Sequence, residues 1–141
     1  MIRRACGEDA AQVTGLLKEL WPGRAMDEDR IREVYRRSLE STSDHLLVAE
    51  EEGHAVGFAS MVIKNSFWQE SYVGYITALV VKENMRGKGT GRALIGELSR
   101  IAAASGCRKV ELDSGFHREG AHRFYEGLGF ERRGFIFSRD S

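Results

Sequence analysis

Cysteine, proline, long apolar runs and an excess of charge of one sign are all scarce in this sequence of 141 residues. The two cysteines, Cys6 and Cys107, lie far apart without metal-type spacing, so neither a disulfide framework nor a zinc site is expected. Basic and acidic residues number 21 each, which argues against a general nucleic-acid binder, because such a protein would carry a basic excess. No membrane-length apolar run occurs, and the N-terminal "MIRRACGEDA" lacks the apolar core of a signal peptide. We therefore expect a reduced, soluble, cytoplasmic protein with no membrane and no nucleic-acid partner.

The spacing of apolar residues predicts a single mixed α/β domain over residues 1–141. Helical spacing occurs first in two N-terminal segments, and two antiparallel strands joined by "EEGH" follow them. The rest of the chain reads as strand, helix, strand, helix and a closing hairpin-like pair. The predicted helices are residues 8–23, 27–41, 90–106 and 118–129, and the predicted strands are residues 45–50, 55–63, 72–81 and 109–114, with the hairpin-like pair at 130–138.

Three glycines stand at every second position in "RGKGTGRA", between a strand-like run and a helix. A dinucleotide-binding fingerprint would need glycine or alanine three places after its second glycine. Read from Gly87 that position is Arg92, and read from Gly89 it is Leu94, so the fingerprint is absent. A nucleoside-triphosphate P-loop would need serine or threonine after Lys88, where Gly89 stands. The remaining pattern, Arg-x-x-Gly-x-Gly, favours a pyrophosphate site on unpaired helix N-terminal amides. The alternative is an exposed basic turn.

Two stretches resemble the GNAT superfamily of N-acetyltransferases. "VVKENMRGKGTGRALI" looks like its acetyl-CoA-binding motif, and "AHRFYEGLGF" looks like its C-terminal helix and strand. The order of elements matches over essentially the whole chain, so the resemblance implies a single-domain GNAT fold, with a mixed six- to seven-stranded sheet flanked by about four helices. Within the superfamily, "HREGAHRFYEGLGFERRGFIFS" is similar to the C-terminal segment of aminoalkylphosphonate N-acetyltransferases.

The resemblance also implies where acetyl-CoA binds. The strand that contains "TALVV" would splay away from the strand "KVELDS", and the pantetheine arm would lie in the wedge between them. A main-chain N–H in the region of Leu79 would polarise the acetyl carbonyl. The pyrophosphate would lie on the amides after the strand, with three cations nearby. The expected coenzyme contacts are Leu79, Val80, Val81, Arg86, Gly87, Lys88, Gly89, Thr90, Gly91 and Arg92.

Tyr125 matches the tyrosine that, in this superfamily, protonates the departing thiolate. A phenol with a pKa near ~10 suits that role, because it stays protonated at neutral pH and can donate to a thiolate whose conjugate acid has a pKa near ~8.5. The alternative is a core tyrosine packed by Ala121, Phe124 and Leu128.

The general base is harder to assign, because the strand "YVGYITALVV" lacks the carboxylate that many relatives carry there. An alkyl amine is protonated at pH 7 and must lose a proton before it attacks the thioester. Glu111 is the preferred candidate, and Asp113 is expected on the same face of the same strand. A water chain from a histidine is the other option. The histidines are His45, His54, His117 and His122.

The acceptor is expected to be a small-molecule primary amine, acetylated by direct attack in a ternary complex. Aromatic residues of the variable segments are candidates for the pocket wall or for the core, and arginines near the C-terminus are candidates for binding an anionic group of the acceptor. The acidic run at residues 50–52 is interpreted as a solvated turn. A non-catalytic acyl-CoA-binding module and an acetyltransferase of protein N-termini or lysines stay open as alternatives, as does a homodimer, which is common in the superfamily. The aromatic candidates are Trp21, Tyr35, Trp68, Tyr72 and Phe135, and the arginines are Arg118, Arg123, Arg132 and Arg133.

Overall fold

A computed structural model describes residues 1–141 and divides the chain into two compact units, Met1–Glu111 and Leu112–Ser141. The first unit contains a five-stranded sheet in the order β1-β2-β3-β4-β5, together with helices α1, α2 and α3. The second unit contains helix α4. No helix combines the length and the apolar character needed to cross a membrane.

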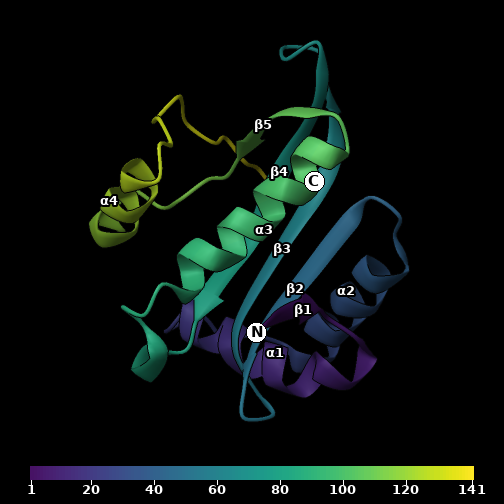
Figure 1. Ribbon diagram of the computed structural model, residues 1–141, viewed down its shortest axis with the longest axis vertical. Helices are drawn as coiled ribbons and strands as arrows, with labels where there is room; N and C mark the ends of the chain where they lie inside the picture. The colour runs from purple at the N-terminus through teal and green to yellow at the C-terminus, as the bar shows by residue number, and fades with distance from the viewer. The chain divides into compact units, whose positions relative to one another are not determined.

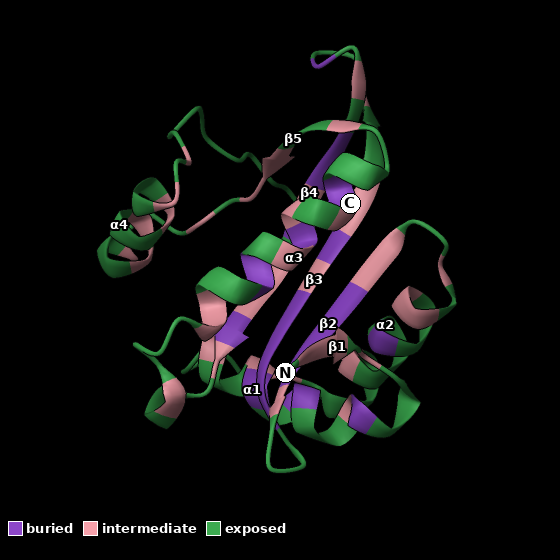
Figure 2. Cartoon of the chain, in the orientation of Figure 1, coloured by how far each residue is buried: buried purple, intermediate pink, exposed green.

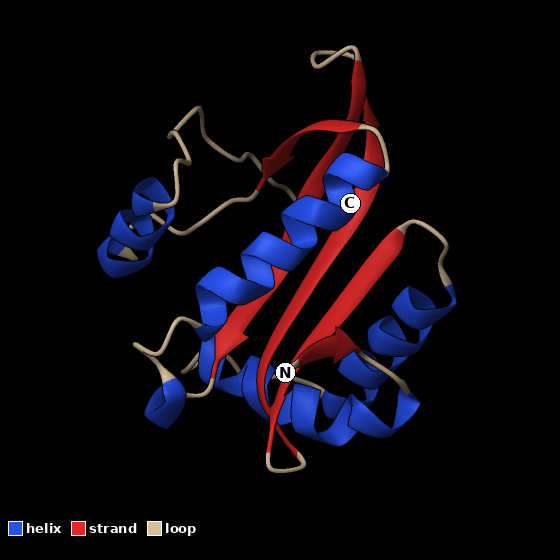
Figure 3. Ribbon diagram, viewed as in Figure 1, coloured by secondary structure: helices blue, strands red, loops and turns tan.

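Figures 1 and 3 show the elements of the first unit, in which all neighbouring strands are antiparallel except β4 and β5, which are parallel. The strands are β1 (Ile2–Arg4), β2 (Asp44–Glu51), β3 (His54–Ser66), β4 (Ser71–Val81) and β5 (Cys107–Glu111). The helices are η1 (Gly7–Asp9), α1 (Ala10–Leu20), α2 (Glu28–Glu40), η2 (Glu83–Met85) and α3 (Thr90–Ala104).

Local sequence signals explain several of these boundaries. The Asp27 side chain accepts a hydrogen bond from the amide of Arg30 at 3.2 Å and so caps α2. The turn between β2 and β3 has two central residues with positive φ, Glu52 at 49° and Gly53 at 78°. Two positive φ angles are what a two-residue hairpin turn of the primed type requires. The predicted helices and strands of the first unit are thus confirmed, with ends that shift by a few residues.

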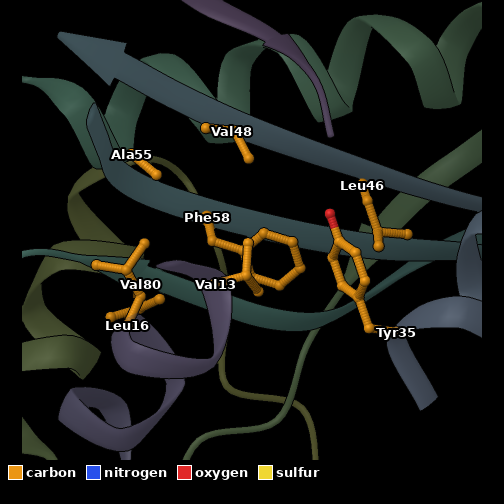
Figure 4. Close-up of a cluster of buried hydrophobic side chains, with 8 residues drawn as sticks. All are labelled: Val13, Leu16, Tyr35, Leu46, Val48, Ala55, Phe58 and Val80. Carbon is orange, nitrogen blue, oxygen red and sulfur yellow. The ribbon is translucent and has the colours of Figure 1, made fainter. Parts of the chain in front are cut away.

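Helices α1 and α2 cover one face of the sheet. Tyr35 of α2 is buried in this core, and its hydroxyl donates a hydrogen bond to the Cys6 carbonyl at 2.6 Å. Tyr35 therefore belongs to the core, which was one of its two predicted roles, and does not wall an acceptor pocket. Figure 4 shows the buried cluster, which consists of Val13, Leu16, Tyr35, Leu46, Val48, Ala55, Phe58 and Val80.

Helix α3 covers the opposite face of the sheet, and it packs close to the strands because two glycines lie beneath it. A Cβ added at Gly57 would lie 3.1 Å from Cδ1 of Leu94, and one added at Gly74 would lie 3.2 Å from the Ala102 Cβ. Figure 2 shows the buried positions along α3 and along β3. This close packing fixes the N-terminus of α3 relative to the end of β4.

An ion-pair network ties β1 to the start of α1. The guanidinium of Arg3 donates to both carboxylate oxygens of Asp9 at 2.8 Å and lies 3.1 Å from Glu50. The hydrogen bond from Arg3 lowers the pKa of Asp9 to about 2, although burial opposes the shift. Glu50 therefore has a structural partner, whereas Glu51 and Glu52 belong to the exposed end of the hairpin, as predicted.

The sheet has five strands, fewer than the six to seven implied by the resemblance, because two predicted strands are absent and one unpredicted strand is present. The short strand β1 was not predicted. The hairpin-like pair predicted at residues 130–138 is wrong, because these residues form no strand. The second unit contains no other strand with which this segment could pair, and an isolated two-stranded hairpin is marginal in water.

Candidate functional site

The edge of β4 that faces β5 is paired over only part of its length. The parallel register runs from Tyr72, opposite Cys107, to Tyr75, opposite Glu111. Strand β5 ends there, while β4 continues through residues 76–81 with no strand paired on that side. The sheet therefore contains an open edge about 20 Å long, at the usual rise of a strand residue.

A bulge lies at the start of this open edge. On β3, Ser60 opposes Ala78 and Met61 opposes Ile76, so Thr77 of β4 is the extra residue. The Thr77 side chain is exposed, and its hydroxyl lies 2.5 Å from the hydroxyl of Ser60. Bulges bend a strand and increase its local twist, so the bulge is suited to turn β4 away from β5 at this point.

Backbone alternation determines which groups of β4 face the open edge. The Lys82 amide donates to the Val56 carbonyl of β3 at 2.8 Å, so the amide and carbonyl of Val80, two residues earlier, also face β3. The amides and carbonyls of Leu79 and Val81 then face the open edge. The Val81 carbonyl accepts a hydrogen bond from Nε of Arg86 at 2.9 Å, as expected of an edge-facing group.

The loop between β4 and α3 leaves a run of amides without partners. Gly87 and Gly89 have φ angles of 79° and 85°, and a Cβ on either would meet no atom within 4 Å. Gly89 is the N-cap of α3, and the first backbone bond of this helix joins the Ala93 amide to the Gly89 carbonyl at 3.0 Å. The amides of residues 87–92 donate no hydrogen bond within the chain. Successive free amides at a helix N-terminus form a concave site for an anion.

The three cations of this loop differ in their surroundings. Arg86 is held by its bond to the Val81 carbonyl, and the Lys88 ammonium lies 3.8 Å from the Met85 sulfur. Arg92 is exposed on the first turn of α3. None of the three forms an ion pair, so their charges are available to an anion bound on the amides.

Tyr125 lies near the end of α4 (Glu119–Gly127) in the second unit. Gly129 has a φ of 93°, its amide donates to the Glu126 carbonyl, and the Phe130 amide donates to the Tyr125 carbonyl, each at 3.0 Å. These bonds form a Schellman motif, which brings Phe130 back onto Tyr125, with ring centroids 5.8 Å apart. Burial raises the pKa of Tyr125 above that of a free phenol, against a smaller opposing effect of Arg118. The phenol is therefore protonated at neutral pH.

The structure separates the candidates for the general base. Glu111 is the last residue of β5, half-buried, at the position where β4 and β5 stop pairing. The prediction that Asp113 shares this strand is wrong, because β5 ends before it. His45 and His54 lie on β2 and at the start of β3, neither of them on β4 or β5. In the second unit, Nε2 of His122 is hydrogen-bonded to the Gly115 carbonyl at 2.8 Å, and His117 is exposed.

The proposed acceptor residues belong to both compact units. Within the second unit, Phe135 contacts Phe116, with ring centroids 5.5 Å apart, and Arg132 pairs with Glu126 at 3.1 Å. Within the first unit, Trp21 ends α1, Trp68 lies in the turn between β3 and β4, and Tyr72 is half-exposed at the start of β4.

One charged residue near the point where β4 and β5 separate was missed by the sequence reasoning. The Lys64 ammonium of β3 lies 4.5 Å from the centre of the Tyr75 ring. The available signal was a single cation directly after the apolar run "AVGFASMVI". The bulge at Thr77 had no comparable signal, because no glycine or proline marks it.

Comparison with known proteins gives a consistent result. Residues 10–130 match the model of the acetyltransferase (GNAT) family. The chain is 29% identical over 138 residues to an aminoalkylphosphonate N-acetyltransferase of Salmonella typhimurium, covering 98% of this chain and 89% of that protein. It is 36% identical over 120 residues to a glucosamine 6-phosphate N-acetyltransferase of Trypanosoma brucei brucei, and this match covers 84% of this chain and 78% of that protein. The aminoglycoside N-acetyltransferase AAC(6')-Iy, solved with a bisubstrate analogue of CoA, matches with a TM-score of 0.85 and 25% identity, covering 100% of this chain and 97% of that one.

Proposed function

The chain belongs to the acetyltransferase (GNAT) family, whose members are acyl-transferring enzymes that use acetyl-CoA. On this basis we propose which of its residues bind the coenzyme and which class of acceptor it acetylates. Residues 1–141 form one acetyltransferase domain in this proposal, because the family match at residues 10–130 runs through both compact units. The acceptor is the primary amine of a small molecule.

The observation that carries the proposal is the continuity between the open edge of β4 and the free amides that follow it. The pantetheine arm, which contains two amide groups, pairs with the edge-facing backbone of Leu79 and Val81, much as an added strand would. Val80 was predicted as a third contact of the coenzyme, but its amide and carbonyl face β3 and its side chain packs in the core, so it is left out of this pairing. The pyrophosphate lies on the amides of residues 87–92, and Arg86, Lys88 and Arg92 supply positive charge.

Each step of the reaction requires a group of this chain. The edge-facing Leu79 amide donates to the acetyl carbonyl and stabilises the negative charge that develops on its oxygen. Glu111 accepts the proton of the attacking ammonium, directly or through one water. A carbon–nitrogen bond forms as the carbon–sulfur bond breaks, the Tyr125 hydroxyl donates its proton to the departing thiolate, and the second proton lost by the nitrogen restores the Tyr125 phenol. Direct transfer needs no covalent enzyme intermediate, and neither cysteine lies in a nucleophile motif.

The acceptor class follows from the similar enzymes. Their names include aminoalkylphosphonate and glucosamine 6-phosphate, and both are primary amines that also carry a phosphorus-based anion. An amine of this kind is the preferred candidate for the acceptor here.

A panel of amines, assayed with acetyl-CoA by release of the free thiol, tests the proposal. The panel contains 2-aminoethylphosphonate, glucosamine 6-phosphate, an aminoglycoside and a peptide with a free N-terminus. Turnover with a small amine and none with the peptide supports the proposal. Turnover with the peptide alone would favour a protein acetyltransferase. Acetyl-CoA binding without turnover of any amine would favour the non-catalytic module and contradict the proposed roles of Glu111 and Tyr125.

A further inference from the structure

The face of the sheet opposite α3 carries a polar patch beside the point where β4 and β5 separate. Gly74 faces α3, because a Cβ at that position would contact Ala102, so the next residue of β4, Tyr75, faces the other way. Val62 of β3 opposes Tyr75, and Lys64 is two residues further along the same strand, on the same face. The position of the Lys64 ammonium over the Tyr75 ring agrees with this assignment.

The N-terminal helices leave this part of the face uncovered. The cluster that packs against α1 and α2 includes Phe58 and Val80, but it does not extend to Tyr75. Tyr75 is half-buried, and both Lys64 and Thr77 are exposed. A small molecule can therefore reach the ring, the ammonium and the hydroxyl from solvent.

Lys64 is a cation without an anionic partner. Most cations of the first unit that contact another polar or aromatic group pair with a carboxylate, as Arg3 does with Asp9 and Arg100 with Glu97. Lys64 instead contacts the face of an aromatic ring, and the ring attracts its positive charge. The ring does not accept hydrogen bonds from the three N–H donors of the ammonium in the way that a carboxylate does. The ammonium keeps its capacity to bind an anion.

We propose that Lys64 binds the anionic group of the acceptor and thereby selects amines that also carry a phosphonate or phosphate. This inference rests on the proposed acetyl transfer and adds a specificity residue to it. The Tyr75 side chain lies between the two ends of the bound acceptor, because its strand β4 lies between the strands of Lys64 and Glu111.

The spacing suits a short aminoalkyl anion. Lys64 and Glu111 stand on strands β3 and β5, two strand spacings or about 10 Å apart across the sheet, and Lys64 is displaced by two residues or about 7 Å along the strands, because it opposes Val73 while Glu111 opposes Tyr75. The Lys64 ammonium already reaches over the Tyr75 ring and so covers part of this distance. An acceptor that places its amine at Glu111 and its anion at Lys64 has its nitrogen at the end of β5, where the open edge begins, and the acetyl group would extend along that edge from Leu79 toward it.

The test compares matched amines that differ in the anion. The pairs are 2-aminoethylphosphonate with ethanolamine and glucosamine 6-phosphate with glucosamine, assayed with the wild-type protein, Lys64→Met, Lys64→Gln and Lys64→Arg. Arg100→Gln is the control, because it also removes an exposed positive charge, but from α3 on the other face. Circular dichroism and acetyl-CoA binding confirm that each variant is folded and binds the coenzyme.

The wild-type protein and Arg100→Gln should prefer the anionic member of at least one pair. Lys64→Met and Lys64→Gln should lower kcat/KM for that amine about 10- to 100-fold, as expected for a lost hydrogen bond to a charged group. The neutral amine should change less than about twofold, and Lys64→Arg should keep most of the preference. The pair that responds identifies a phosphonate or a sugar phosphate as the ligand.

Two results would overturn the role of Lys64 while leaving acetyl transfer intact. One is turnover of the neutral and anionic amines with equal kcat/KM by the wild-type protein, and the other is an unchanged preference in Lys64→Met. If no amine is turned over, the proposed function fails, and Lys64 is judged by binding instead. In that case 2-aminoethylphosphonate should still raise the melting temperature of the wild-type protein and not that of Lys64→Met, and equal shifts would reject the site.

Discussion

The substitution Gly89→Ala separates coenzyme binding from folding at the N-cap of α3. Gly89 has a φ of 85°, where an L-residue costs about 1–2 kcal/mol. A Cβ at this position meets no atom within 4 Å, so the free protein should fold with that cost alone. Gly53→Ala is the matched control, because Gly53 has a φ of 78°, has equal space around it and lies at the hairpin turn between β2 and β3.

The magnitudes follow from the length of the chain. For 141 residues, an unfolding entropy of about 2.1 cal/mol/K per residue gives about 0.3 kcal/mol/K, so 1 kcal/mol shifts Tm by about 3–4 °C. Both glycine variants should therefore lose about 3–7 °C without ligand. Acetyl-CoA at 100 times its wild-type Kd adds about 2.7 kcal/mol, or about 9 °C, to the wild-type protein and to Gly53→Ala.

Gly89→Ala should respond much less to the coenzyme. Its methyl group adds bulk in the loop where the pyrophosphate is proposed to approach the backbone, and weakened charge-assisted hydrogen bonds should raise Kd about 10- to 100-fold. The same acetyl-CoA concentration then adds only about 0.4–1.4 kcal/mol, or roughly 1–5 °C. Differential scanning fluorimetry with and without acetyl-CoA measures both effects. A full ligand shift in Gly89→Ala, or an equal loss in Gly53→Ala, would refute the placement of the pyrophosphate.

Three further predictions concern single side chains. Tyr125→Phe should lower kcat about 10²- to 10⁴-fold with nearly unchanged acetyl-CoA affinity, because it removes the proton donor but keeps the ring, and an unchanged kcat would reduce Tyr125 to a packing residue. Glu111→Gln should lower kcat/KM most strongly near neutral pH, where the amine is protonated, and the loss should shrink as pH approaches the pKa of the amine; a loss independent of pH would contradict a role as base. Asp9 has a pKa lowered to about 2, so its interaction with Arg3 stabilises the fold above its unfolded pKa of 3.8 and is lost as pH falls from there toward 2. Asp9→Asn should lower the free energy of unfolding by about 2 kcal/mol at pH 7 and by far less at pH 2, as measured by urea titration at both values, and equal losses would show that the charge contributes nothing.

The part of the site predicted best from the sequence is the part fixed by local rules. Positive φ angles at Gly87 and Gly89 require glycine, and helical spacing marks α3 without any knowledge of its neighbours. The loop and its free amides were therefore predicted at the correct residues. The Schellman turn after α4 has a similar local origin, since Gly129 ends the helix.

The features that the sequence did not predict depend on contacts between distant segments. The three residues of β1 form a strand only because they pair with β2, and the bulge at Thr77 arises from the register of β4 against β3. The contact of Lys64 with Tyr75 likewise exists only because the pairing of β3 with β4 brings the two side chains together. The same limit explains the failed hairpin at residues 130–138, where alternating apolar residues lack a partner strand in their own unit.

The open edge of β4 also has a consequence for the behaviour of the protein in solution. Unpaired strand edges are templates on which other chains add strands, and natural proteins protect them with charges, bulges or covering segments. Here the bulge at Thr77 and the guanidinium of Arg86 on the Val81 carbonyl are the protective features that the chain itself supplies. A coenzyme whose amides occupy the edge-facing groups of Leu79 and Val81 would complete that protection. Saturation with acetyl-CoA would then guard this protein against aggregation through the open edge of β4, and storage or refolding without it would leave that edge without this protection.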